Sequence, residues 1–119
     1  MKTKMIHTIR QWIPETADLI PDLGNLDDPA TAYLLLHRLA DTCAEKFKLG
    51  HEGELDRVKE IIKVVNLLYI NGNLYTRNAI ENEFLATLSV EESPGSLKKH
   101  MELFPSELRR EYIKTILEN

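Results

Sequence analysis

Two long amphipathic segments, residues 28–49 and residues 52–71, dominate this sequence, and a glycine follows each of them. Their apolar residues recur every three to four positions, as they do along one face of an α-helix. These residues are Tyr33, Leu35, Leu36, Leu39, Ala40, Cys43, Ala44 and Phe47 in the first segment and Leu55, Val58, Ile62, Val65 and Tyr69 in the second. Pro29 follows the capping carboxylate of Asp28 and suits the first helical position, while Gly50 suits the left-handed conformation that ends a helix. The sequence therefore predicts a helical hairpin at the centre of the fold.

A short amphipathic helix and an acidic connector are expected before the hairpin. The apolar side of the helix is formed by Met5, Ile9, Trp12 and Ile13. Pro14 ends this helix, because proline has no N–H group to continue the hydrogen-bond ladder. Residues 15–28 carry five carboxylates and no Lys or Arg, and Pro21 and Gly24 interrupt them. This composition predicts an acidic connector with a helical turn that its apolar residues hold against the core.

Three further helices are expected after the hairpin. Thr76 or Asn78 caps the first, Ser93 and Pro94 begin the second, and Pro105 begins the third. The residues predicted to face inward are Ile80, Phe84, Leu85 and Leu88, then Leu97 and Met101, then Leu108, Tyr112, Ile113, Ile116 and Leu117. The chain is therefore predicted to be all-α, with five to six helices in one domain over residues 1–119. We favour a compact antiparallel bundle over a short αα-solenoid stack, because no solenoid repeat is present.

The composition is that of a globular protein without marked affinity for nucleic acid. Of the 119 residues, 43% are hydrophobic and 29% are charged, and the net charge is -4. Nucleic acid is not an expected partner, since a negative chain lacks the excess of Lys and Arg that neutralises phosphates. The single Cys43 cannot form an internal disulfide, and neither a signal peptide nor a run of about 20 apolar residues is recognisable. These observations predict a cytoplasmic protein with no membrane association.

No catalytic or metal-binding signature is recognisable, so no catalytic residue, metal or cofactor is predicted. His37 and Asp41 lie four residues apart on one helix, where two ligands are too few for a zinc site and a surface pair is favoured. Cys43 lies on the apolar face of its helix and is interpreted as a packing residue instead of a nucleophile. The carboxylates that follow His51 suit the first turn of a helix, where they meet the positive end of its dipole.

Two polar groups of residues suggest a surface for a partner. The predicted partner-binding residues are Asp18, Asp22 and Asp27 in the acidic connector and Asn78, Glu81 and Asn82 on one face of a helix. The two amides and the carboxylate could bind the backbone or Arg side chains of a partner. Alternatively, they hydrogen-bond a neighbouring loop of this fold, as buried amides usually do.

The chain also resembles small bacterial all-helical proteins of unknown function. The resemblance lies in residues 9–14, 33–43, 78–84 and 104–117, and it concerns spacing and length. In size and acidity the chain is similar to the immunity proteins of bacterial toxin systems. The first resemblance implies only the fold, whereas the second implies a basic protein that this chain neutralises.

The sequence therefore favours a cytosolic protein-interaction module that neutralises or regulates a basic protein partner. Complementary charge of this kind chiefly accelerates association. One alternative is a small enzyme or ligand carrier that uses His37, Asp41 or the turn at His51 in a pocket between helices. Another is a homo-oligomer that closes its excess apolar helix surface on a second copy.

Overall fold

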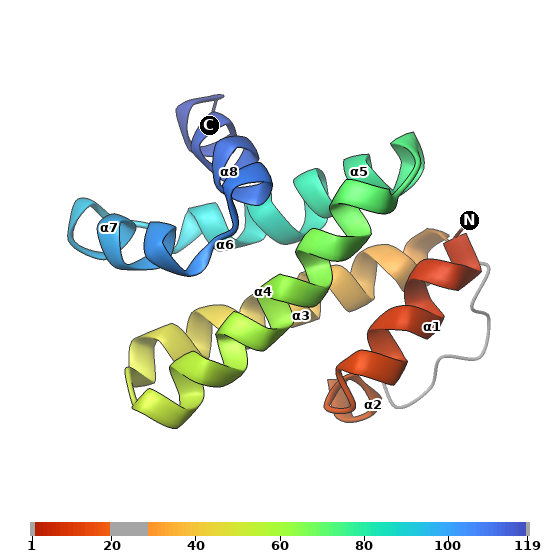
Figure 1. The fold of residues 1–119 in the computed structure, drawn as a ribbon, viewed down its shortest axis with the longest axis horizontal. Helices are drawn as coiled ribbons and strands as arrows, with labels where there is room; N and C mark the ends of the chain where they lie inside the picture. Colours follow the sequence, from red (N-terminus) through yellow and green to blue (C-terminus); the bar gives the residue numbers. More distant parts are fainter. Residues whose placement is uncertain (1, 20–28, 119) are drawn as a thin grey trace.

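Both long helices are present in the computed structural model, which describes residues 2–19 and 29–118 (Figure 1). Helix α3 spans Pro29–Leu49, helix α4 spans Glu52–Asn71, and the two helices pack against each other. Gly50 joins them with φ of 68°, a left-handed conformation that glycine adopts without steric cost. The predicted hairpin is therefore confirmed, while the capping role of Asp28 lies outside the described residues.

Helix α1, Lys2–Trp12, packs against α3 and α4 (Figure 1). Met5, Ile6 and Ile9 are buried on this helix, and Ile13, the residue that follows it, is also buried. Trp12, which the sequence pattern placed on this side, is 64% exposed. Where α1 ends, the core covers Ile13 and leaves Trp12 at the surface. The inward placement of Trp12 was wrong.

The acidic connector begins with a single helical turn that is tied to both neighbours. This turn, α2, spans Thr16–Leu19 and contacts α1 and α3, which confirms the predicted helical turn. Buried Thr16 donates its hydroxyl hydrogen to the carbonyl of Ile13 at 2.8 Å. Just before it, the carboxylate of Glu15 accepts two hydrogen bonds from the guanidinium of Arg57 in α4. This bidentate pair lowers the pKa of Glu15 and connects α1 and α2 to α4.

One continuous helix follows the hairpin, and its middle turn is π-helical. It consists of α5 (Leu74–Ala79), η1 (Ile80–Leu85) and α6 (Ala86–Val90). The side chain of Asn73 caps it by accepting a hydrogen bond from the backbone N–H of Thr76 at 3.0 Å. The expected caps, Thr76 and Asn78, were therefore wrong by a few residues. The inward face was predicted correctly, since Ile80, Phe84, Leu85 and Leu88 are all buried.

Two shorter helices complete the chain, α7 (Pro94–Leu103) and α8 (Ser106–Glu118). The backbone N–H of Ser93 donates to the hydroxyl of Ser96 at 3.0 Å, so α7 begins where the sequence predicted. On α8, Leu108 and Tyr112 are buried, whereas the predicted inward residues Ile113 and Leu117 are 42% and 80% exposed. Because α8 lies at the edge of the molecule, only a narrow stripe of it meets α4, η1 and α6.

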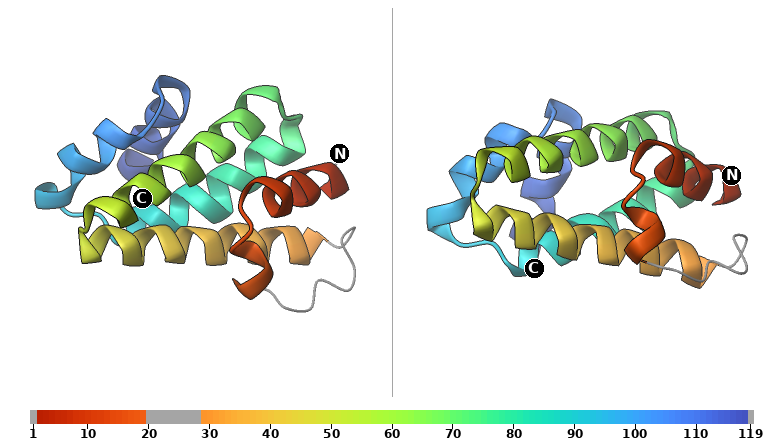
Figure 2. Two further views of the ribbon diagram at one scale, coloured as in Figure 1. Left: turned by 60° about the horizontal axis from the view of Figure 1, so that its bottom comes forward. Right: turned by 90° about the horizontal axis from the view of Figure 1, so that it is seen from below.

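These elements form an all-α globule around one apolar core. With α5, η1 and α6 counted as one helix and α2 as a turn, the described residues contain six helices and no strand. Figure 2 shows α3 along one side of the molecule, with α4 and the α5–α6 helix running over it. The radius of gyration is 13.4 Å, close to the roughly 13.5 Å expected for a compact chain of this length. None of the described helices is long and apolar enough to cross a membrane.

The glycine at position 72 is required by the close approach of α4 and α5. A Cβ atom there would lie 2.5 Å from the carbonyl oxygen of Leu68 and 2.7 Å from Cγ2 of Thr76. Gly72→Ala is therefore expected to lower the free energy of unfolding by about 1–3 kcal/mol, as overpacking does. Gly53→Ala is the matched control, because nothing lies within 4 Å of its Cβ position inside α4.

The control should raise the free energy of unfolding by about 0.5–1 kcal/mol, since alanine favours a helix interior over glycine. Urea unfolding of the two variants and the wild type measures both effects. Equal stabilities of the two variants would contradict the close approach at Gly72.

Candidate functional site

The predicted residues Asn78, Glu81 and Asn82 lie together on α5 and η1. Asn78 and Asn82 are exposed, and Glu81 is half-buried. Glu81 accepts a hydrogen bond from the hydroxyl of Tyr69 in α4. Burial, together with this bond, raises the pKa of Tyr69. Glu81 thus joins two elements of the fold, although its partner is a helix and not the loop that the alternative interpretation named.

Two hollows border this segment, one on each side. A hollow of about 140 Å³ lies toward α8, and its ionisable residues are Glu81, Glu111, Lys114 and Glu118. A hollow of about 420 Å³ lies toward α3, and its ionisable residues are His37, Asp41, Glu83 and Glu91. Asn82 and Ala86 line both hollows, so they form the ridge between them. We call this surface, formed by Asn82, Ala86 and the ionisable residues of the two hollows, the acidic face.

Part of the negative charge of the acidic face is compensated within the fold. Glu91 forms an ion pair with Lys48 at 3.1 Å, and Asp41 lies 3.8 Å from His37. Across the described residues, no ion pair within 4 Å reaches Glu83, Glu111 or Glu118. Two cationic side chains, Lys114 and His37 when protonated, line the hollows beside six carboxylates. The face is therefore predominantly negative.

His37 and Asp41 form the predicted surface pair. Their side chains are 50% and 59% exposed, and Nδ1 of His37 also lies 3.0 Å from the hydroxyl of Thr87 in α6. Within the described ranges, no group of three or more His, Cys, Asp or Glu side chains is arranged to hold a metal ion. His37 therefore supplies a polar contact between α3 and α6.

Cys43 has the environment of a packing residue. It is fully buried in the core, and this burial raises the pKa of its thiol to about 12. A thiol in that state is neutral at physiological pH and has no path to a substrate. The packing interpretation is confirmed.

The remaining predicted positions lie away from the acidic face or outside the described chain. Asp18 is exposed on α2, and Asp22 and Asp27 lie outside the described residues. Their role in binding stays a prediction. His51 is exposed at the start of α4, and nearby Glu54 accepts a hydrogen bond from Lys46 at 2.6 Å.

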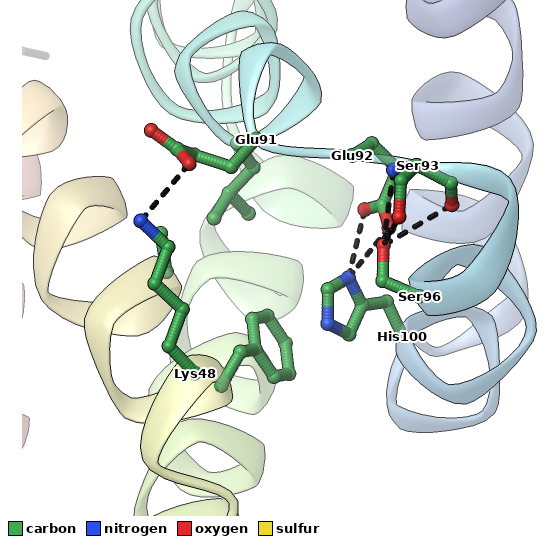
Figure 3. A pocket seen from close by; sticks show the side chains of 9 residues that line it. Lys48, Glu91, Glu92, Ser93, Ser96 and His100 are labelled. Carbon is green, nitrogen blue, oxygen red and sulfur yellow. Dashed lines mark hydrogen bonds and ion pairs between the residues drawn. The ribbon is translucent and has the colours of Figure 1, made fainter.

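A second polar cluster, which the sequence did not reveal, surrounds the carboxylate of Glu92 (Figure 3). Nδ1 of His100 lies 2.8 Å from this carboxylate, and the hydroxyls of Ser96 and Tyr112 donate to it. The side chain of Glu92 is 6% exposed and that of His100 is 11% exposed. The ring of His100 also stacks on Phe47 of α3, with 3.7 Å between ring centroids.

The hydrogen bonds of this cluster govern its ionisation. Burial by itself raises the pKa of Glu92, but the hydrogen bonds from His100, Ser96 and Tyr112 outweigh it, and the net pKa is lowered. The buried hydroxyl of Tyr112 has its pKa raised. Glu92 is therefore a carboxylate that connects α7 to α8. Only the spacing of Glu92, Ser96 and His100 by four residues could have suggested this cluster.

Residues 6–118 match the model of a family described as a domain of unknown function, DUF7674. No curated protein and no solved structure matches the chain.

Proposed function

We propose that this chain, which belongs to the DUF7674 family of domains of unknown function, is a cytosolic protein-interaction module that binds a basic protein partner. Binding would neutralise or regulate that partner. The acidic face is the binding surface in this proposal. The observation that supports it is the placement of Asn82 and Ala86 between two hollows whose carboxylates outnumber their cationic side chains.

The shape and charge of the acidic face suit a partner with protruding Lys or Arg side chains. Glu111 and Glu118 border the smaller hollow and Glu83 the larger, so a cation in either hollow meets at least one carboxylate without an internal ion pair. The amide of Asn82, exposed on the ridge, can donate to and accept from a partner backbone. Opposite charges of this kind accelerate encounter, and salt weakens them where they remain exposed.

Charge reversal on both sides of the ridge tests this placement. The variant Glu83→Lys/Glu118→Lys changes one carboxylate in each hollow. We expect this variant to bind a basic partner at least about tenfold more weakly than the wild type. The lost attraction and the new repulsion together should weaken the binding free energy by more than about 1.4 kcal/mol. The matched control, Asp56→Lys/Glu60→Lys, reverses the same charge at exposed positions of α4 outside the acidic face.

The measurement is capture from a lysate of the source cell at low and high ionic strength, with all three proteins immobilised at equal density. The wild type and the control should retain the same basic protein at low salt and release it at high salt. A partner that the face variant retains fully would overturn this placement of the interface. In that case Asp18→Lys tests whether the acidic connector binds instead.

A further inference from the structure

A cavity of about 140 Å³ lies between α7 and the helices α3 and α6 (Figure 3). It lies largely outside the proposed partner surface. Ala44 and Phe47 of α3 and Leu88 of α6 form its apolar wall. The opposite wall is polar and contains Glu92, Ser93, Ser96 and His100. Lys48 and Glu91, which form an ion pair at 3.1 Å, stand at its edge. Glu91 is the one ionisable residue that this cavity shares with the acidic face.

The imidazole of His100 is held in a defined orientation at this cavity. Its Nδ1 lies 2.8 Å from the Glu92 carboxylate, and a carboxylate can only accept, so Nδ1 carries the hydrogen. Stacking on Phe47 fixes the plane of the ring. The hydrogen bonds from Ser96 and Tyr112 in turn hold Glu92 in place.

The other ring nitrogen of His100, Nε2, faces the cavity. In Figure 3 it lies on the side of the ring away from Glu92, toward Lys48. No described residue forms a hydrogen bond with it. Since Nδ1 carries a hydrogen, Nε2 of a neutral imidazole presents a lone pair, which accepts a hydrogen bond from an O–H group.

The carboxylates around the cavity already have partners, since Glu92 accepts hydrogen bonds from His100, Ser96 and Tyr112 and Glu91 pairs with Lys48. A charged ligand would therefore have to displace one of these contacts, whereas a neutral ligand would not. The volume matches a ligand of one small ring, since an apolar cavity of about 150 Å³ holds one benzene molecule. The cavity thus fits a single small ring or a body of similar size.

We propose that this cavity binds a small neutral molecule with one hydroxyl group, about the size of phenol. Its hydroxyl donates to Nε2 of His100, and its apolar body packs on Ala44, Phe47 and Leu88. The combination of an apolar wall with a few oriented polar groups is the usual composition of a small-molecule site. This proposal does not rest on the partner surface proposed above, with which the cavity shares Glu91.

Phenol and toluene are the probes, because they match in size and differ in the hydroxyl group. Titration of ¹⁵N-labelled protein at pH 8, followed by long-range ¹H–¹⁵N spectra of the histidine rings, reports on Nε2 and Nδ1 separately. Phenol should bind about fivefold more tightly than toluene, as one net hydrogen bond predicts. It should shift the Nε2 resonance of His100 and leave that of Nδ1 nearly unchanged.

Two variants separate the apolar wall from the hydrogen bond. Ala44→Leu enlarges a side chain of the apolar wall and so reduces the cavity, and it should abolish binding of both probes. His100→Phe keeps an aromatic ring over Phe47 but removes Nε2, so the preference for phenol should disappear while toluene still binds. If His100→Phe fails to fold, the Nε2 shift of the wild type and the Ala44→Leu result still test the proposal. Equal affinities for the two probes, or phenol binding that survives Ala44→Leu, would overturn the proposal.

Discussion

Replacing Glu92 with alanine is expected to lower the free energy of unfolding by about 2–5 kcal/mol, because it leaves buried hydrogen-bond donors without their acceptor, at about 1–3 kcal/mol each. The carboxylate is 6% exposed and accepts from three donors on α7 and α8. Its removal leaves the imidazole of His100 and the hydroxyl of Tyr112 buried with no acceptor. Chemical unfolding followed by circular dichroism measures the loss.

The neighbouring residue provides the matched control for this experiment. Glu91 is 48% exposed and pairs with Lys48 on the surface. Glu91→Ala should therefore lower the free energy of unfolding by no more than about 1 kcal/mol, because exposed ion pairs contribute little to stability. Similar losses for the two variants would show that the Glu92 cluster does not anchor α7 and α8.

The same carboxylate makes stability depend on pH in a defined direction. The pKa of Glu92 is lowered from its ordinary value of 4.5 in the folded protein, so the folded state binds its proton less readily than the unfolded chain. The resulting stabilisation is fully present above pH 4.5 and is lost as pH falls through the lower, folded pKa. Glu92→Gln removes this contribution. The stability difference between wild type and variant should therefore shrink below pH 4.5, and a constant difference would contradict the assignment.

Phe84→Ala should lower the free energy of unfolding by about 3–5 kcal/mol. Trp12→Ala should lower it by less than about 1 kcal/mol, although tryptophan is the larger side chain. Phe84 is fully buried where η1 crosses the core, so its removal leaves a cavity. Trp12 is 64% exposed at the end of α1. Urea unfolding should be followed by far-ultraviolet circular dichroism, because Trp12→Ala removes the single tryptophan of the chain.

The reverse order of these two costs would mean that α1 packs through Trp12, as its sequence spacing suggested. Ile6 provides a further control for this helix. It is fully buried, so Ile6→Ala should cost about 2–5 kcal/mol, more than Trp12→Ala, if α1 lies as described.

The sequence by itself determined the helices and most of their ends. Pro29, Gly50 and the Ser93–Pro94 pair act through the backbone of a few neighbouring residues, so their effects can be read without the rest of the chain. Most of the inward faces of α3, α4 and η1 were predicted correctly, although Tyr33 of α3 is 37% exposed and Ile113 of α8 is 42% exposed. They failed for Trp12 and Leu117, near helix ends, because neighbouring packing decides there which side is covered.

The candidate sites also depend partly on the local sequence and partly on the tertiary structure. Asn78, Glu81 and Asn82 were identified from one stretch of helix, but the hollows beside Glu81 and Asn82 exist only because α3 and α8 pack on either side. The Glu92 cluster depended still more on tertiary structure, since it joins His100 and Tyr112 from two helices to a carboxylate in the preceding turn. Local spacing determines which face a side chain occupies, whereas only the packing of helices determines what that side chain meets.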